Sequence, residues 1–322
     1  MYDYFMEKLI YQMFILGTGE HLDYALSKNL GGVIFFTRDI KSKKQFQNLI
    51  KDVCLKSVTK PFLSIDQEGG RVERTENIHP RYLSARYAYA KGMDFLKNQT
   101  ETIAKELKDY GINLNFAPCA DVNTNPDNPI IGERAFSDKA DEVINGVGVV
   151  SDIYRKNGII PCIKHYPGHG DADSDSHLTL PRIDLPLDEM EKIHIAPFKA
   201  GVEGGIEMIM AAHLHCMCFD KEVIPSSLSG NAIGYLRNNL GYNGVVISDD
   251  MVMKGVQAYG SAEAVIMGIE AGLDMFIFRD ADDKTVETID KVVEIVNSDV
   301  KLKERVLQSN RRIFDLKQRY GI

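Results

Sequence analysis

The densest group of reactive side chains lies between Lys164 and His177. The stretch KHYPGHGDADSDSH holds one lysine, three histidines and three aspartates, with two glycines and a proline that interrupt regular structure. A loop of this composition can bring polar side chains over a site and can move. Within it, Asp175 and His177 have the spacing of a carboxylate that orients an imidazole and fixes its tautomer. Because an imidazole titrates at about pH 6.5, we expect this pair to give and take a proton.

A second candidate is Asp249, which follows the apolar run Gly244–Ile247. A carboxylate at the end of a strand can attack an electrophilic sugar carbon or stabilise the positive charge that develops there. Asp250 is adjacent, and neighbouring strand residues point to opposite faces. We therefore expect at most one of the two to face the site, and the other to cap a helix or form a salt bridge.

Asp66 and Arg74 stand in a comparable place, after the run Pro61–Ile65 and on either side of Gly69-Gly70. A carboxylate there suits bidentate hydrogen bonding to vicinal hydroxyl groups. It could instead pair with a cation such as Lys164, and both roles could hold at once. Arg134 is a further candidate polar contact.

The stretch His213–Cys218, HLHCMC, has a superficial likeness to a metal site. In a strand His213 and His215 would share a face, but the two cysteines lack the usual C-x₂-C spacing. We expect His213 to support the site, the rest to be partly buried packing, and no metal to bind. A metal-dependent hydrolase remains an alternative.

These residues must be positioned by the eight short apolar runs of the chain, which alternate with stretches of helical periodicity. The runs are 14–16, 32–36, 61–65, 112–117, 159–163, 206–212, 244–247 and 273–278. Such alternation predicts a parallel sheet, and eight strands favour closure into a barrel. Polar residues follow nearly every run, which disfavours an open doubly wound sheet with a single switch point. We predict one domain over residues 1–322, a single (β/α)8 TIM-type barrel.

Composition limits the partners and the compartment. The 322 residues carry a net charge of -8, so no basic excess is available for nucleic acid. The N-terminal stretch is acidic where a secretory signal would be basic, and no run of roughly 18 apolar residues could span a membrane. Five cysteines at irregular spacing fit reduced thiols. We expect a cytoplasmic protein with no membrane association and no obligatory protein partner.

The stretch KHYPGHGDADSDSH resembles the signature of glycoside hydrolase family 3 β-N-acetylglucosaminidases of the bacterial NagZ type. Tyr166 replaces the usual phenylalanine. Counterparts of GGVIFFTRDI, SIDQEGGRVERT, NPIIGERAFS, MAAHL and VISDDM follow the order of the family, so the resemblance covers most of the chain. Asp250–Met253 (DMVM) departs from the commoner Asp-Leu-Ser-Met, and Ser137 stands where glycine is frequent.

The resemblance implies roles for named residues. Asp249 would be the nucleophile that forms a covalent glycosyl-enzyme, and His177, assisted by Asp175, would protonate the leaving oxygen and later activate water. The residues that match the family's N-acetylglucosamine contacts are Asp66, Arg74, Arg134, Lys164 and His165. No cofactor is implied, and the lone barrel would supply both catalytic groups.

The resemblance also implies an activity, that of a retaining exo-β-N-acetylglucosaminidase. The substrate would be a GlcNAc-containing glycoside or muropeptide, handled in peptidoglycan recycling. One alternative keeps the same intermediate but releases it to phosphate, because a non-carboxylate acid/base repels an anionic acceptor less. A non-catalytic sugar-binding barrel is a third class, which the Asp249 and Asp175-x-His177 pattern disfavours.

Overall fold

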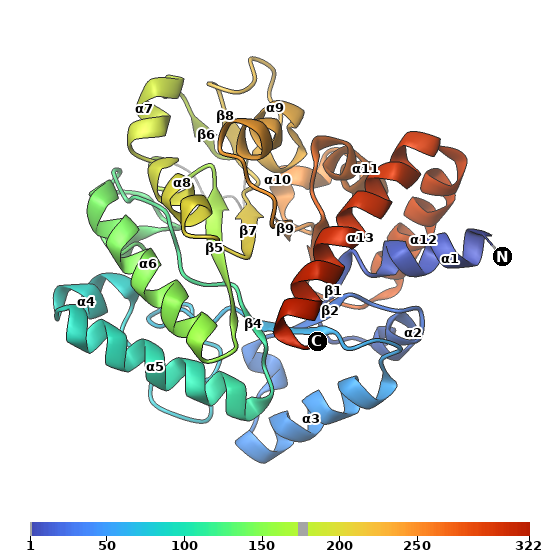
Figure 1. Cartoon of the computed structure of the whole chain (residues 1–322), viewed down its shortest axis with the longest axis horizontal. Helices are drawn as coiled ribbons and strands as arrows, with labels where there is room; N and C mark the ends of the chain where they lie inside the picture. The colour runs from blue at the N-terminus through green and yellow to red at the C-terminus, as the bar shows by residue number, and fades with distance from the viewer. Residues whose placement is uncertain (1, 173–179) are drawn as a thin grey trace.

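Eight parallel strands form a closed barrel in the computed structural model, which describes residues 2–172 and 180–322 (Figure 1). Around the barrel the strands follow the order β1-β10-β9-β7-β5-β4-β3-β2. Their bounds are β1 Phe14–Leu16, β2 Gly32–Phe35, β3 Phe62–Ile65, β4 Leu114–Asn115, β5 Ile160–Tyr166, β7 Met208–Ala211, β9 Val245–Asp250 and β10 Met275–Phe278. Each strand lies in one of the eight predicted runs or overlaps it, so the prediction of a (β/α)8 barrel is confirmed.

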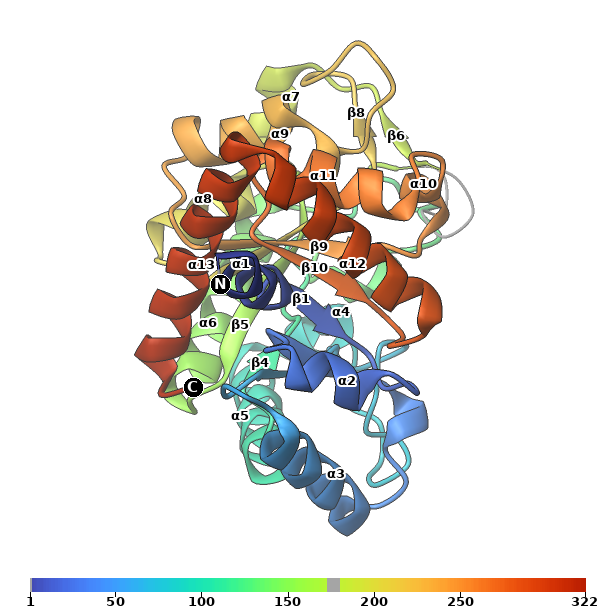
Figure 2. The ribbon, with the colours of Figure 1, turned by 90° about the vertical axis from the view of Figure 1, so that its right-hand side faces the viewer.

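Helices connect successive strands and cover the outside of the barrel (Figures 1 and 2). They are α1 Tyr2–Tyr11, α2 Leu22–Ser27, α3 Lys43–Lys56, α4 Ala85–Ala90, α5 Met93–Tyr110, α6 Ala140–Lys156, α7 Leu187–Lys192, α8 Ala196–Glu203, α9 Gly230–Gly234, α10 Lys254–Gln257, α11 Ser261–Ala271, α12 Asp283–Ser298 and α13 Val300–Tyr320. Shorter helical turns occupy Thr37–Asp39, Gly132–Arg134, Ser226–Leu228 and Tyr235–Asn239. After the last strand, β10, the chain forms α12 and α13.

Local sequence signals explain where the longer helices begin and end. Helix α12 starts where the Asp282 side chain accepts a hydrogen bond from the Thr285 amide. Helix α5 stops at Gly111, whose φ of 100° is the left-handed conformation that glycine adopts without steric cost. Among the described residues, none of the helices is long and apolar enough to cross a membrane.

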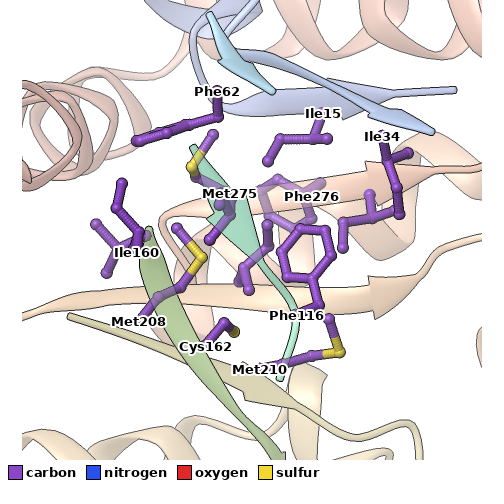
Figure 3. Packing of buried hydrophobic residues seen from close by; sticks show 14 of the residues in the cluster. Ile15, Ile34, Phe62, Phe116, Ile160, Cys162, Met208, Met210, Met275 and Phe276 are labelled. Carbon is purple, nitrogen blue, oxygen red and sulfur yellow. The ribbon is translucent and has the colours of Figure 1, made fainter. Parts of the chain in front are cut away.

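The barrel interior is filled by apolar side chains from successive strands. Figure 3 shows Ile15, Phe62, Ile160 and Met208 directed toward one another inside it. Burial of such side chains contributes roughly 1.5–3 kcal/mol each. The interior is therefore a packed core, and a site can form only above it, at one end of the barrel.

The strands that carry the site run further than predicted. Strand β5 continues to Tyr166, so Lys164 and His165 lie within it, where we expected them just after its end. Strand β9 likewise includes Asp249. The two strands were predicted too short because their last residues are polar, and only the apolar residues were used to define a strand.

A small parallel sheet lies outside the barrel and was not predicted. Strand β6, Arg182–Ile183, pairs with β8, His215–Cys216. The sheet packs on a separate apolar cluster that includes Ala172, Met190 and Leu214. Two-residue strands carry no periodicity that a sequence could show.

Candidate active site

A cavity of about 370 Å³ opens at the carboxyl-terminal ends of the barrel strands. Six of the predicted residues line it together: Asp66, Arg74, Arg134, Lys164, His165 and Asp249. Apolar residues of the barrel, among them Ile34, Met210 and Ile277, complete its lining. The structure therefore brings together polar groups that lie as far as 183 positions apart in the sequence.

Two β-bulges place the polar groups. Opposite β7, one residue separates Lys164 from Tyr166 on β5, whereas their partners Met210 and Ala211 are adjacent. The extra residue is His165, and both Lys164 and His165 line the cavity. Bulges redirect side chains and are common beside active sites.

Strand β9 has the second bulge, opposite β10. Ile247 pairs with Met275 and Asp250 pairs with Ile277, which leaves an extra residue on β9. The Ser248 hydroxyl accepts a hydrogen bond from the Ile277 amide and fills the interrupted ladder. As a result Asp249 and Asp250 both line the cavity, and our expectation that only one would face it is wrong.

Lys164 is the centre of a buried ionic network. Its Nζ lies 2.6 Å from Asp66 Oδ1 and 2.7 Å from Glu68 Oε1, and only 2% of the residue is exposed. Burial opposes its charge, but the two carboxylates outweigh burial and raise the pKa of Lys164. The alternative that Asp66 pairs with Lys164 is confirmed, and this pairing is compatible with a role of Asp66 in sugar binding.

Arg134 is fixed by Glu68, which sequence reasoning missed. Nε and Nη2 of Arg134 donate to the two Glu68 oxygens at 3.0 and 2.9 Å, in the bidentate arrangement that guanidinium groups favour. Burial opposes the charge of Glu68, yet Arg134 and Lys164 together keep its pKa well below the usual range. Glu68 stands two positions after candidate Asp66 in the DQEGGR stretch, which was the available signal.

His165 is held in one tautomer by Asp121. Its Nδ1 lies 2.7 Å from Asp121 Oδ2, and its Nε2 lies 3.1 Å from Arg134 Nη2. Since a guanidinium only donates, Nε2 must accept and Nδ1 must carry the proton. Asp121 is fully buried and also accepts the amides of His165 and His169, so its pKa stays far below the usual value despite burial.

The pKa values of the two adjacent aspartates are shifted in opposite directions. Burial would raise the pKa of Asp249, but His165, His213 and the Asp250 amide, which donates at 2.7 Å, hold it below the ordinary value. Burial does raise the pKa of Asp250, although its carboxylate forms an ion pair with Arg279. Among residues 2–172 and 180–322 no cation forms a salt bridge with Asp249, and an ionised carboxylate of this kind suits a nucleophile. Asp250 is the salt-bridge partner that we expected beside it.

Two further histidines belong to the site. His213 lies next to Asp249; its Nδ1 is 2.7 Å from Ser227 Oγ, and burial lowers its pKa. His169 lines the cavity, and neither of its ring nitrogens has a partner among residues 2–172 and 180–322. Burial lowers the pKa of His169 to about 4, so the ring is neutral at pH 7. His169 was visible in the motif but received no role.

The motif's two glycines allow close packing where we expected a hinge. A Cβ on Gly170 would lie 1.7 Å from the Val122 carbonyl oxygen, and one on Gly168 would lie 2.7 Å from His194 Cβ. Asp175 and His177, the predicted proton-transfer pair, lie outside the described residues.

Possible metal ligands gather in a different place from HLHCMC. Among the described residues, the buried group is Cys119, Asp121 and His165, and an exposed group is Glu20, His21 and Asp283. In the buried group, Asp121 is engaged by His165 and by the Cys119 thiol, which donates at 3.2 Å. Burial raises the pKa of Cys119 well above its usual value, which disfavours the thiolate that a metal would need.

Residues 7–316 match the model of the glycosyl hydrolase family 3 N terminal domain. The chain belongs to glycosyl hydrolase family 3. Its curated relatives include a beta-hexosaminidase of Tolumonas auensis, 32% identical over 263 residues, which cover 77% of this chain and 75% of that protein. Beta-hexosaminidase A of Pseudoalteromonas piscicida is also 32% identical, but the match spans only 45% of its length.

Two solved structures have the same barrel. A family 3 beta-N-acetylglucosaminidase from Paenibacillus sp. matches with a TM-score of 0.93 at 29% identity, over 98% of this chain and 62% of that one. A beta-N-acetylhexosaminidase from Beutenbergia cavernae matches with a TM-score of 0.88 at 26% identity, over 98% of both chains. The family resemblance read from the motifs is thus confirmed.

Proposed function

We propose that this family 3 chain is a retaining exo-β-N-acetylglucosaminidase. The observation that carries the proposal is the position of Asp249: an ionised carboxylate, bonded within the described residues only to its neighbour's amide, in a cavity ringed by fixed polar groups. Its volume of about 370 Å³ falls in the roughly 300–1,000 Å³ range of small-molecule sites. The barrel core closes it below, which suits a terminal sugar.

The chemistry follows from this arrangement. Asp249 attacks the anomeric carbon and forms a covalent glycosyl-enzyme, while a proton passes to the leaving oxygen. We assign the proton to His177, with Asp175 as its partner, on the family resemblance. Water, activated by the same imidazole, then releases the sugar with retained configuration.

The polar residues around Asp249 hold the sugar. Asp66 presents carboxylate oxygens to vicinal hydroxyls, and Lys164, which is fixed by two acids, presents the remaining ammonium proton. Arg74 lies 3.9 Å from Asp66 and can close around the same hydroxyls. These groups are preorganised, so little conformational freedom is lost on binding.

The physiological substrate that we propose is a muropeptide with terminal GlcNAc, handled in the cytoplasm during peptidoglycan recycling. Family resemblance and the beta-hexosaminidase names of the relatives support this choice. Comparing turnover of a GlcNAc-anhydro-muramyl peptide with that of chitobiose tests it. Preference for chitobiose would contradict it.

Replacement of Asp249 by alanine tests the activity itself. We expect turnover of an aryl β-N-acetylglucosaminide to fall by about 10³-fold or more, with an unchanged unfolding transition. Asp188→Ala, which removes an exposed carboxylate of α7, is the control and should retain full activity. Near wild-type turnover by Asp249→Ala would refute the assignment.

A phosphorylase is the second candidate, because the cavity wall offers an anionic acceptor several cations. Arg74, Lys164 and Arg279 all line it. Adding phosphate and analysing the product separates the two activities. Sugar 1-phosphate would show phosphorolysis, and free sugar at an unchanged rate would show hydrolysis.

A further inference from the structure

Two thiols at the small sheet formed by β6 and β8 lie close enough to react with each other. Cys216 Sγ and Cys218 Sγ are 3.2 Å apart. Strand β8 ends at Cys216, and the chain then turns, with the Phe219 amide donating to the Cys216 carbonyl at 3.1 Å. This turn brings together two side chains that would otherwise be separated along an extended strand.

The pair has the asymmetry of a reactive dithiol. Cys216 is 2% exposed, whereas Cys218 is half-buried and can meet a small reagent. A hydrogen bond from the Cys216 thiol lowers the pKa of Cys218 and raises that of Cys216, to which burial adds. The accessible sulfur is thus the better thiolate, and the buried one stands behind it.

The backbone around the thiols is hydrogen-bonded to β6 and to the residue before it. The Met217 amide, between the two cysteines, donates to the Ile183 carbonyl at 3.0 Å, and the His215 amide donates to the Pro181 carbonyl at 2.8 Å. These bonds tie β8 to β6, the first strand after residues 173–179. Cys216 also packs in the same apolar cluster as Ala172, which precedes those residues.

We propose that Cys216 and Cys218 are a modification site, a dithiol that a small disulfide oxidises reversibly to an intramolecular disulfide. The Cys218 thiolate attacks one sulfur of the small disulfide, forms a mixed disulfide and releases one thiolate. Cys216 sulfur then attacks Cys218 sulfur and releases the second thiolate. The two cysteine protons go to the released thiolates, and the small disulfide is reduced to two thiols.

Ring closure has a mechanical consequence for turnover, which rests on the proposed function. The two sulfurs must approach from 3.2 Å to about 2.05 Å, and the backbone at Met217 must adjust. We expect that adjustment to weaken the hydrogen bond from the Met217 amide to the Ile183 carbonyl and to shift β6. Because a shift of about 1 Å at a catalytic group can cost on the order of 10²-fold, we expect oxidation to reduce turnover about tenfold.

The experiment uses the full reduced chain, oxidised glutathione as the probe, and N-ethylmaleimide to block the thiols that remain. We expect the peptide containing both cysteines to carry no blocker and to be lighter by the hydrogens of both thiols. Cys218→Ser should not form this link. Cys54→Ser, which removes an exposed thiol elsewhere, should form it as the unaltered chain does.

Turnover of the aryl glycoside is measured on the same samples, before and after dithiothreitol. We expect the loss to be reversed by dithiothreitol and to be absent in Cys218→Ser. Blocker on both cysteines, or a lasting glutathione adduct at Cys218, would overturn the modification site. A disulfide that leaves turnover unchanged would overturn the link to β6. If the reduced chain has no hexosaminidase activity, the proposed function fails, and the peptide masses still decide the modification.

Discussion

Two buried lysines at opposite ends of the barrel have opposite pKa shifts. Lys164, at the carboxyl-terminal end, lies between Asp66 and Glu68, and these raise its pKa. Lys317, at the other end, is 6% exposed and donates to the Gln12 side chain and the Lys60 carbonyl, with the Phe62 ring 5.0 Å away. Burial lowers the pKa of Lys317 to about 7.

The difference in partners distinguishes a lysine of the candidate site from a lysine that only stabilises the fold. Carboxylates around Lys164 keep it charged and fix its position in an open cavity, where the network can be completed by a ligand. The partners of Lys317 are uncharged, so its role is to join α13 to the strands above it. Burial of a charged group therefore indicates function only together with a cavity and with groups left free to bind.

Lys164→Met should cause the largest loss of activity and tests the role of the lysine at the carboxyl-terminal end of the barrel. Loss of the cation leaves Asp66 and Glu68 without their nearest partner and removes one of the proposed sugar contacts. We expect kcat/KM for the aryl glycoside to fall by about 10²-fold or more. Lys317→Met is the matched control, and we expect its kcat/KM to be unchanged. An equal loss of kcat/KM in both variants would contradict the functional difference between the two lysines.

Asp121→Asn should have an intermediate effect, because Asp121 bonds to His165 and does not itself line the cavity. An amide can donate to Nδ1 and so release the tautomer that faces Arg134. We expect activity to fall about 10–100-fold, mainly in kcat/KM, with a folded protein. If Asp121→Asn had unaltered kinetics, the orientation of His165 would not matter to the reaction.

Lys317→Met should have the smallest effect, visible only in the pH dependence of stability. Below pH 7 Lys317 is charged in both the folded and the unfolded chain, and its burial destabilises the folded chain. Between pH 7 and the unfolded pKa of about 10.4, Lys317 is neutral when folded and charged when unfolded, so the free energy of unfolding rises with pH. The unaltered chain should therefore gain roughly 1–3 kcal/mol of unfolding free energy relative to Lys317→Met between pH 7 and 10. Urea unfolding at several pH values measures this, and parallel curves would contradict it.

The comparison also shows what the sequence could predict. Alternating apolar runs placed all eight strands because barrel strands are buried on both faces. Strand-end chemistry identified Lys164, His165 and Asp249. The two bulges were not predictable, since one extra residue leaves no mark on periodicity, and without them both aspartates could not be expected in one cavity.

The missed residues have a common physical reason. Glu68 and Asp121 hold the predicted groups from behind, and their importance comes from contacts between strands that only the fold brings together. The sequence shows a polar residue after nearly every strand. It does not show whether such a carboxylate faces the cavity or supports another side chain. Asp249 and Asp250 show the same ambiguity within one dipeptide.

The central claim is that Asp249 forms a covalent glycosyl-enzyme. The most direct measurement is the mass of the protein quenched during turnover of an activated fluorinated N-acetylglucosaminide that slows hydrolysis of the intermediate, followed by peptide mapping. We predict one sugar per chain, attached to Asp249, and none on Asp249→Ala. A sugar attached to Asp250, or an inverted first product with no adduct, would contradict the account.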